Sequence, residues 1–249
     1  MIKPFRQGSR FLFFYSKMGD FFQEAEMLGD MASVQSVKVR TRVNRSEIRS
    51  VLEDIERIPS IHAKWLNTLS LLEHIGARKI HASQTGNSIS EMVLRHASEE
   101  ARHAAFFKKL TLRVGSEEFS GYEPATLLAG NSAVIYFQRL DSIVNRSLSS
   151  EAFSRGKQKL LCYLYVTKLI EERAGLVYEE YERILSSGES GISLKSIIKE
   201  EESHLQEMNF HLQDNDPKFS ERTDYFREKE SIFFSKFFET LRNLIPVNS

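Results

Sequence analysis

Glutamate and histidine recur one helical turn apart in two separate stretches of the chain. Glu100 and His103 form one E-x-x-H motif, and Glu201 and His204 form another. Residues three apart lie on the same face of an α-helix. That face is otherwise apolar in both stretches, with Ile89, Val93, Ala104, Phe107 and Val114 around the first motif and Leu194, Ile197, Leu205, Met208 and Leu212 around the second. Carboxylate and imidazole groups on a buried helix face are suited to holding metal ions.

A further carboxylate precedes each motif on an apolar helix face. Glu73 lies 27 residues before Glu100, and Glu171 lies 30 residues before Glu201. Both separations fit a chain that runs to the end of one helix, turns, and returns to the same level on the next. Four buried carboxylates need compensating charge, which two divalent cations would supply. The predicted metal ligands are therefore Glu73, Glu100, His103, Glu171, Glu201 and His204.

The choice between Glu171 and its neighbour Glu172 depends on the helix face and on a weak internal duplication. Leu169–Gly175 aligns with Leu71–Ala77, which places Glu171 opposite Glu73 and small residues one turn later in both segments. Glu172 shares a more polar face with Lys168. These observations favour Glu171 as the ligand and keep Glu172 as the alternative.

Two further residues are candidates for roles close to the metal ligands. His96 lies one turn before Glu100 on the same helix face. It could be a seventh ligand or a base near the metals, but we favour its interpretation as a packed histidine. Tyr178 lies two turns after Glu171. It could be a redox-active tyrosine, but we favour its interpretation as a packed tyrosine with a hydrogen-bonded hydroxyl.

Other polar residues on the same helices are expected to be structural or solvated. Glu200 and Glu202, together with Lys199, are interpreted as a solvated charged face. The remaining histidines are interpreted as structural, helix-surface or helix-end residues: His62, His74, His81 and His211.

The elements that must position these residues are predicted to be helices. Asn44 with Glu47, and Ser88 with Glu91, have capping-box spacing, and Pro124 suits a first helical position. No alternating β-branched run competes with the helical pattern. The expected helices cover about 44–57, 60–84, 88–114, 124–146, 151–186 and 193–214, with a C-terminal helix at about 218–244. The fold class is all-α.

Composition narrows the class of protein. The chain has 249 residues, 41% of them hydrophobic, and equal numbers of basic and acidic residues, which disfavours a nucleic-acid binder. A single cysteine, Cys162, excludes an intrachain disulfide framework and a cysteine-rich metal site. No apolar run is long enough to span a bilayer, and Phe11–Tyr15 lacks the flanks of a signal peptide. We expect a cytoplasmic protein with one domain over residues 1–249, comprising an N-terminal arm (1–59), a core bundle (about 60–214) and the C-terminal helix.

Phenylalanine is concentrated near both ends of the chain. Six of 18 lie in residues 1–22 and six more in 219–238. Helical spacing in the second group predicts that this segment packs onto the bundle. An apolar substrate tunnel or a docking face is the alternative interpretation. The spaced set is Phe226, Phe233, Phe234, Phe237, Phe238 and Leu241.

Over about residues 60–214 the six predicted ligands resemble those of the ferritin-like superfamily of di-metal carboxylate proteins, in which two helices supply a Glu and two supply E-x-x-H. The extra helix between Glu100 and Glu171 is more like the oxygenase, oxidase and ribonucleotide-reductase small-subunit branch. The stretch from Leu169 through Tyr178 and Tyr181 to the second motif is similar to aldehyde-deformylating oxygenases. Demethoxyubiquinone hydroxylases and arylamine N-oxygenases use ligands of the same kind.

The resemblance implies a ferritin-like four-helix bundle with additional N-terminal, crossover and C-terminal helices. It implies two Fe ions, with Mn/Fe or two Mn as variants, and O₂ as co-substrate in the oxidation of a small, apolar organic molecule. Two electrons would come from an external ferredoxin or flavoprotein, and a homodimer is compatible with this class. The alternatives are a ferroxidase or metal-handling protein, and a non-catalytic interaction or stress protein.

Overall fold

The computed structural model describes residues 42–83, 89–187 and 191–246, and in them the fold is all-α, as predicted. None of the described helices is long and apolar enough to cross a membrane. The α-helices are α2 (Arg45–Glu56), α3 (Pro59–Ser83), α4 (Glu91–Val114), α5 (Gly130–Ser149), α6 (Arg155–Ser187), α7 (Lys195–Asn215) and α8 (Phe219–Asn243), and the short 3-10 helices are η1 (Glu117–Phe119) and η2 (Pro124–Thr126).

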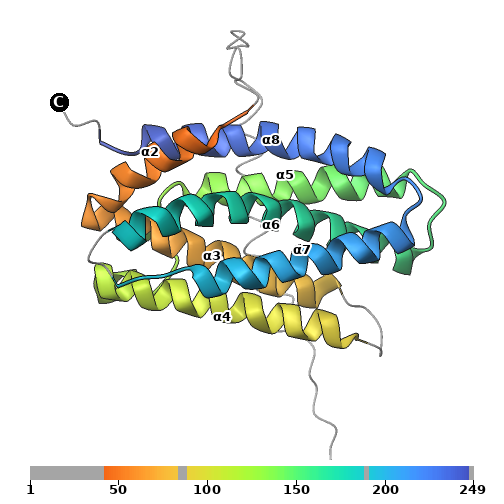
Figure 1. Ribbon diagram of the computed structural model, residues 1–249, viewed down its shortest axis with the longest axis horizontal. Coiled ribbons are helices and arrows are strands. Elements are labelled where there is room, and N and C mark those ends of the chain that lie inside the picture. Colours follow the sequence, from red (N-terminus) through yellow and green to blue (C-terminus); the bar gives the residue numbers. More distant parts are fainter. Residues whose placement is uncertain (1–41, 84–88, 188–190, 247–249) are drawn as a thin grey trace, which may run out of the picture. The chain divides into compact units, whose positions relative to one another are not determined.

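Two helix pairs form the part of the fold that carries the predicted ligands. Helix α3 packs mainly against α4, and α6 packs mainly against α7. Helix α5 connects the two pairs and packs against α6 and α8. In the view of Figure 1, α8 and α5 lie above α6, whereas α4 lies at the bottom. The predicted ligands therefore lie on α3, α4, α6 and α7, while α2, α5 and α8 pack against α6.

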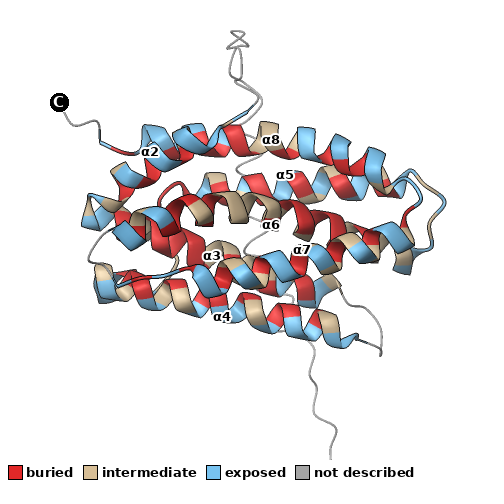
Figure 2. Ribbon diagram, in the orientation of Figure 1, coloured by how far each residue is buried: buried red, intermediate tan, exposed pale blue. Residues whose placement is uncertain are grey.

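Two apolar clusters fill the interior, and the predicted ligands lie between them. On α3, Leu69 belongs to the first cluster and Ile80 to the second, and Glu73 lies between these two residues. Helices α4, α6 and α7 also contribute residues to both clusters, on opposite sides of their own ligands. Figure 2 shows buried residues along the facing sides of these helices. The polar layer thus occupies the middle of an otherwise apolar core.

Helix α2 begins as the capping box predicts and is held to α6 by charge. The Asn44 side chain accepts a hydrogen bond from the Glu47 backbone N–H, and the Glu47 carboxylate accepts one from the Asn44 backbone. Arg45 and Arg49 both pair with the fully buried Glu180 of α6. Part of the predicted N-terminal arm is therefore a helix packed on the bundle.

The starts of α4 and α5 differ from the prediction, and α6 begins at Arg155 rather than at about residue 151. Helix α4 begins behind Ser90, whose hydroxyl accepts from the backbone of Val93, and Ser88 lies outside the described residues. The segment at Pro124 forms only η2, and α5 begins at Gly130. The reason is tertiary: Asn67 of α3 donates to the Thr126 carbonyl at the end of η2, and Thr68 bonds to the Leu128 backbone before α5, which competes with continuation of the helix.

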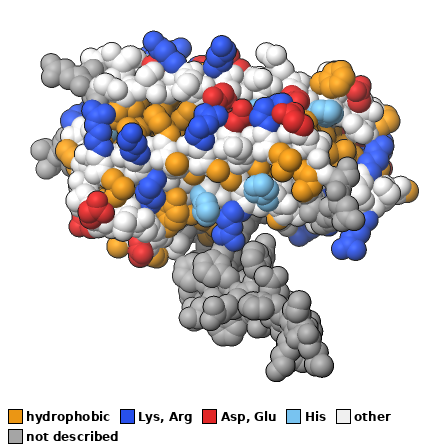
Figure 3. Space-filling model, turned by 90° about the horizontal axis from the view of Figure 1, so that it is seen from below, with side chains coloured by type: hydrophobic (Ala, Val, Ile, Leu, Met, Phe, Trp, Pro, Cys, Tyr) orange, Lys and Arg blue, Asp and Glu red, His pale blue; other side chains and the backbone are white. Residues whose placement is uncertain are grey.

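The C-terminal phenylalanines pack into the core, as the favoured interpretation predicts. Phe226, Phe234, Phe237 and Phe238 are buried, and Phe234 and Phe237 lie against Tyr136 of α5. The phenylalanines of residues 1–22 lie outside the described residues. On the face shown in Figure 3, apolar side chains are interspersed with lysine and arginine.

Candidate metal centre

The structure places all six predicted ligands in the buried layer between the two apolar clusters. They come from four helices and are each at most 8% exposed. Glu73 is on α3, Glu100 and His103 on α4, Glu171 on α6, and Glu201 and His204 on α7.

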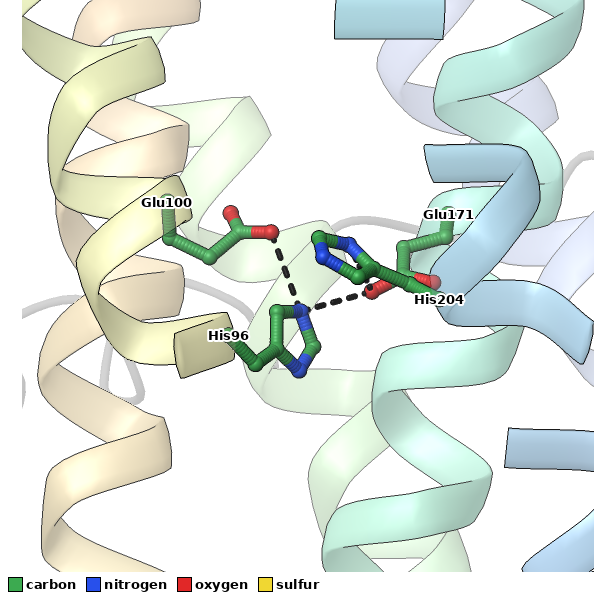
Figure 4. Close-up of side chains that lie close together, drawn as sticks. All are labelled: His96, Glu100, Glu171 and His204. Carbon is green, nitrogen blue, oxygen red and sulfur yellow. Dashed lines mark hydrogen bonds and ion pairs between the residues drawn. The ribbon is translucent and has the colours of Figure 1, made fainter. Parts of the chain in front are cut away.

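Their ligand atoms form two groups that share one carboxylate. In each group the four atoms lie within 4.8 Å of one another, which is close enough for a single cation to contact all of them. Glu100 belongs to both groups, so the two positions are adjacent. The carboxylate-rich position consists of Glu73, Glu100, His103 and Glu201; the histidine-rich position consists of His96, Glu100, Glu171 and His204 and is drawn in Figure 4.

His96, for which a packed histidine was the favoured interpretation, joins the predicted ligands in one of these groups, as the seventh-ligand alternative requires. Its Nε2 lies 2.8 Å from Glu171 Oε1 and 3.1 Å from Glu100 Oε1. Its ring centre lies 4.2 Å from that of His204. The sequence placed His96 on the correct helix face, but its proximity to α6 and α7 is visible only in the folded structure.

Glu201 links the two positions from the side of α7. One of its oxygens lies 3.1 Å from His103 Nδ1 and the other 3.7 Å from His204 Nδ1. His204 Nδ1 also lies 3.6 Å from Glu171 Oε1. The histidines of the two E-x-x-H motifs thus direct their Nδ1 atoms into the same layer of carboxylates.

Several of these atoms are buried without a hydrogen-bond partner in the part of the chain that the structure describes. Burying such atoms without a partner is costly, and native structures rarely do so. Oxygen and imidazole nitrogen are ligands of Fe, Mn and Zn, so the orphaned atoms fit a pair of divalent cations. The orphaned atoms are His103 Nδ1, Glu171 Oε1 and Oε2, Glu201 Oε2 and His204 Nδ1.

Without metal, the carboxylates must be compensated by protons. Burial, followed by the charges of Glu100 and Glu201, raises the pKa of Glu73 well above its usual value. Burial also raises the pKa of Glu171 to about 7. Burial opposes ionisation of Glu201 too, but the neighbouring imidazoles of His103 and His204 outweigh it and lower the pKa of Glu201 to about 2.

Two histidines of the layer also have raised pKa values and so favour their protonated forms. Burial lowers the pKa of His96, but its contacts with Glu100 and Glu171 outweigh burial and raise the pKa to about 12. The pKa of His204 rises to about 9 for the same kind of reason, with Glu201 as the main partner. Metal binding at this centre would therefore displace protons, since ligating imidazole must be neutral.

A second set of carboxylates holds the outer nitrogens of the histidines. His204 Nε2 donates to Glu99 at 2.7 Å, and His103 Nε2 donates to Glu200 at 2.7 Å. Each acceptor directly precedes a ligand glutamate, so α4 orients a histidine of α7 and α7 orients one of α4. Such partners fix the ring and the tautomer of a metal-binding histidine.

Sequence reasoning missed both of these carboxylates. Glu200 was predicted to be part of a solvated face, and this was wrong: Glu200 is half-buried and hydrogen-bonded to His103. Lys199 and Glu202 are exposed, as predicted. Glu99 received no prediction. The available signal was the repeated pair, E-E-x-x-H, in both motifs.

Two tyrosines of α6 contact the ligand layer. The Tyr178 hydroxyl donates a hydrogen bond to Glu73, consistent with the predicted role next to the ligands. The Tyr163 hydroxyl is hydrogen-bonded to His96 Nδ1 at 2.8 Å. Tyr163 was not singled out from sequence, because nothing in the helical pattern of α6 shows that it reaches α4.

The contacts of Glu171 and Glu172 favour Glu171 as the ligand. Glu171 faces the histidine-rich position, whereas Glu172 pairs with Lys168 and Arg227. Gly76 lies beside the ligand layer, where an added Cβ would come within 3.1 Å of Glu100 Oε2.

Comparison with protein-family models, curated proteins and solved structures found no match for this chain.

Proposed function

We propose that this protein is a ferritin-like di-metal carboxylate protein, and that its centre holds two iron ions, or a Mn/Fe pair, for O₂-dependent oxidation of a small organic substrate. The observation that carries the proposal is the pair of buried four-residue groups that share Glu100. Their donors are carboxylate and imidazole, the set used by di-iron and di-manganese bundles.

The helix arrangement supports the ferritin-like part of the proposal. Two helix pairs, α3 with α4 and α6 with α7, each supply a glutamate followed by an E-x-x-H motif. Helix α5 accounts for the long connection between the pairs. This combination matches the oxygenase and oxidase branch better than a bundle joined by an extended crossover.

The roles of the individual residues follow from their contacts. Glu73, His103 and Glu201 would hold one ion, and His96, Glu171 and His204 the other, with Glu100 available to both. Glu99 and Glu200 would keep the histidines oriented. Two bound irons would supply the capacity to reduce O₂, with electrons from an external ferredoxin or flavoprotein.

The surroundings of the centre favour an apolar substrate. Apolar clusters flank the ligand layer on both sides, and the ligands themselves are buried. A charged substrate in that environment would need partners that the flanking residues do not offer. A small apolar molecule would be the better fit.

The first test is the metal content of protein purified from iron-supplemented cells, followed by optical spectra after O₂ is added to the reduced protein. About two irons per chain, with an O₂-dependent absorption change, would support the proposal. Iron that is oxidised and retained far beyond two per chain would favour the ferroxidase alternative. Absence of bound metal would sink the enzyme proposal and favour the non-catalytic one.

A further inference from the structure

The two metal positions differ in their donors, because Glu201 belongs only to one of them and His96 only to the other. The carboxylate-rich position has three carboxylates and one imidazole, whereas the histidine-rich position has two of each. The additional imidazole belongs to His96, four residues before Glu100. The residue four before Glu201, in the other motif, is Ile197. The internal duplication is therefore broken at this point.

His96 is held in a ligand-like orientation. Its side chain is 1% exposed, and its Nδ1 is hydrogen-bonded to Tyr163 at 2.8 Å. That bond leaves Nε2 directed at Glu171 and Glu100, as Figure 4 shows. A packed histidine needs only satisfied nitrogens, whereas this one directs a nitrogen at the two carboxylates of a four-residue group.

On the basis of the function proposed above, we propose that the two positions select different ions. Imidazole donors suit Fe, Co, Ni and Zn, whereas carboxylate-rich sites suit Mn and Mg. The histidine-rich position fills first, with an imidazole-preferring ion such as Fe²⁺ or Co²⁺. The carboxylate-rich position carries more negative charge and fewer imidazoles, so it accepts Mn²⁺ from a mixed supply. His96 is the residue that creates this selectivity, and Tyr163 positions it.

The test uses metal-free full-length protein, one equivalent of Co²⁺ and an excess of Mn²⁺, without O₂. Anomalous diffraction at the cobalt and manganese edges then locates each ion in the crystal. We expect cobalt at the histidine-rich position and manganese at the carboxylate-rich position. Cobalt spread evenly over both positions, or concentrated at the carboxylate-rich one, would overturn the inference.

Variants show whether His96 is responsible. His96→Gln should lower Co²⁺ affinity at the histidine-rich position by about tenfold or more, since even loss of an outer-sphere partner costs about 10–100-fold. Cobalt should then distribute over both positions. His81→Gln, a change at an exposed histidine of α3, is the control and should leave the distribution unchanged. If His96→Gln behaves like this control, the inference is wrong.

A second variant keeps the test decisive if His96→Gln does not fold. Tyr163→Phe retains the imidazole but removes its Nδ1 partner, and should weaken the preference for cobalt in the same direction.

The di-metal proposal and the selectivity proposal can be told apart when either fails. If the wild-type protein binds neither Co²⁺ nor Mn²⁺, the di-metal proposal itself is wrong. If it binds two ions without preference, only the selectivity is wrong.

Discussion

Buried carboxylates occur in two kinds of environment in this protein. Outside the ligand layer, two buried carboxylates face fixed cations: Glu180 pairs with Arg45, Arg49 and Arg183, and Glu230 pairs with Arg173. Within the ligand layer, the ion pairs of the described residues give these carboxylates histidine partners only, without arginine or lysine. The layer contains Glu73, Glu100, Glu171 and Glu201.

Burial alone therefore does not identify a metal centre. Glu180 is as deeply buried as any ligand, but its charge is neutralised permanently by arginines, which cannot lose their protons in a protein. The ligand layer is neutralised by protons on histidine and glutamate, which a cation can displace. The two regions therefore differ in how the negative charge is neutralised: by fixed arginines in one, and by protons that a cation can replace in the other.

The largest expected effect is that of Glu100→Ala, because Glu100 belongs to both four-residue groups. The variant should lose stoichiometric binding of two metal ions. Its helices should remain folded, since the change removes a buried carboxylate that has no fixed cation. Metal analysis and far-UV circular dichroism check both expectations. Glu91→Ala, at an exposed position of α4, is the control. Two metals per chain in Glu100→Ala would refute the ligand assignment.

Glu230→Ala is expected to do the opposite: it should lower the stability of the fold and leave metal binding in place. Glu230 accepts hydrogen bonds from Arg173 and from the Tyr136 hydroxyl, and its loss leaves the largely buried Arg173 without its carboxylate. Breaking such a pair costs about 3–5 kcal/mol of unfolding free energy. Denaturant unfolding of the metal-free protein measures this loss, with the exposed Glu228→Ala as control. Loss of metal without loss of stability would erase the distinction between the regions.

A smaller effect should separate two neighbours on α7. Glu200→Ala removes the acceptor of His103 Nε2 and should weaken metal binding by about 10–100-fold. Glu202→Ala changes an exposed glutamate two residues away and should have no effect. Competition with a chelator measures both affinities. Equal affinities in the two variants would show that Glu200 does not support the ligand.

The burial of the predicted ligands could be predicted because it depends on a local rule. Helical periodicity fixes the face on which a residue lies, so Glu100 and Glu201 could be placed at the centre of apolar stripes. The start of α2 was predictable for the same reason, since its capping box involves residues only three apart.

Contacts between helices could not be predicted in this way. The bonds of Glu99 to His204 and of Glu200 to His103 require that α4 and α7 be neighbours, and Tyr163 reaches His96 only because α6 passes α4 at that level. The predicted start of α5 was wrong for a related reason, because hydrogen bonds to α3 override the preference of Pro124 for the first position of a helix.

The histidines repeat the contrast on a smaller scale. His62, expected near a helix surface or end, is 4% exposed and hydrogen-bonded to Tyr181. Burial without a carboxylate partner lowers its pKa to about 4 from 6.5, whereas the carboxylate-bound His204 shifts upward. The unfolded chain therefore binds a proton at His62 that the folded chain excludes, so this contribution to stability is present above pH 6.5 and is lost as the pH falls towards 4.

Between pH 7 and pH 5.5 this linkage amounts to about 1 kcal/mol. Metal-free wild-type protein should lose that much more unfolding free energy over this range than His62→Gln does, because the ligand layer titrates equally in both. Denaturant unfolding at the two pH values measures the difference, and the exposed His81→Gln should follow the wild type. Identical pH dependence in wild type and His62→Gln would mean that His62 is protonated when folded. Burial without a carboxylate would then not suffice to keep a histidine neutral here, and the contrast between the two regions would hold for glutamates only.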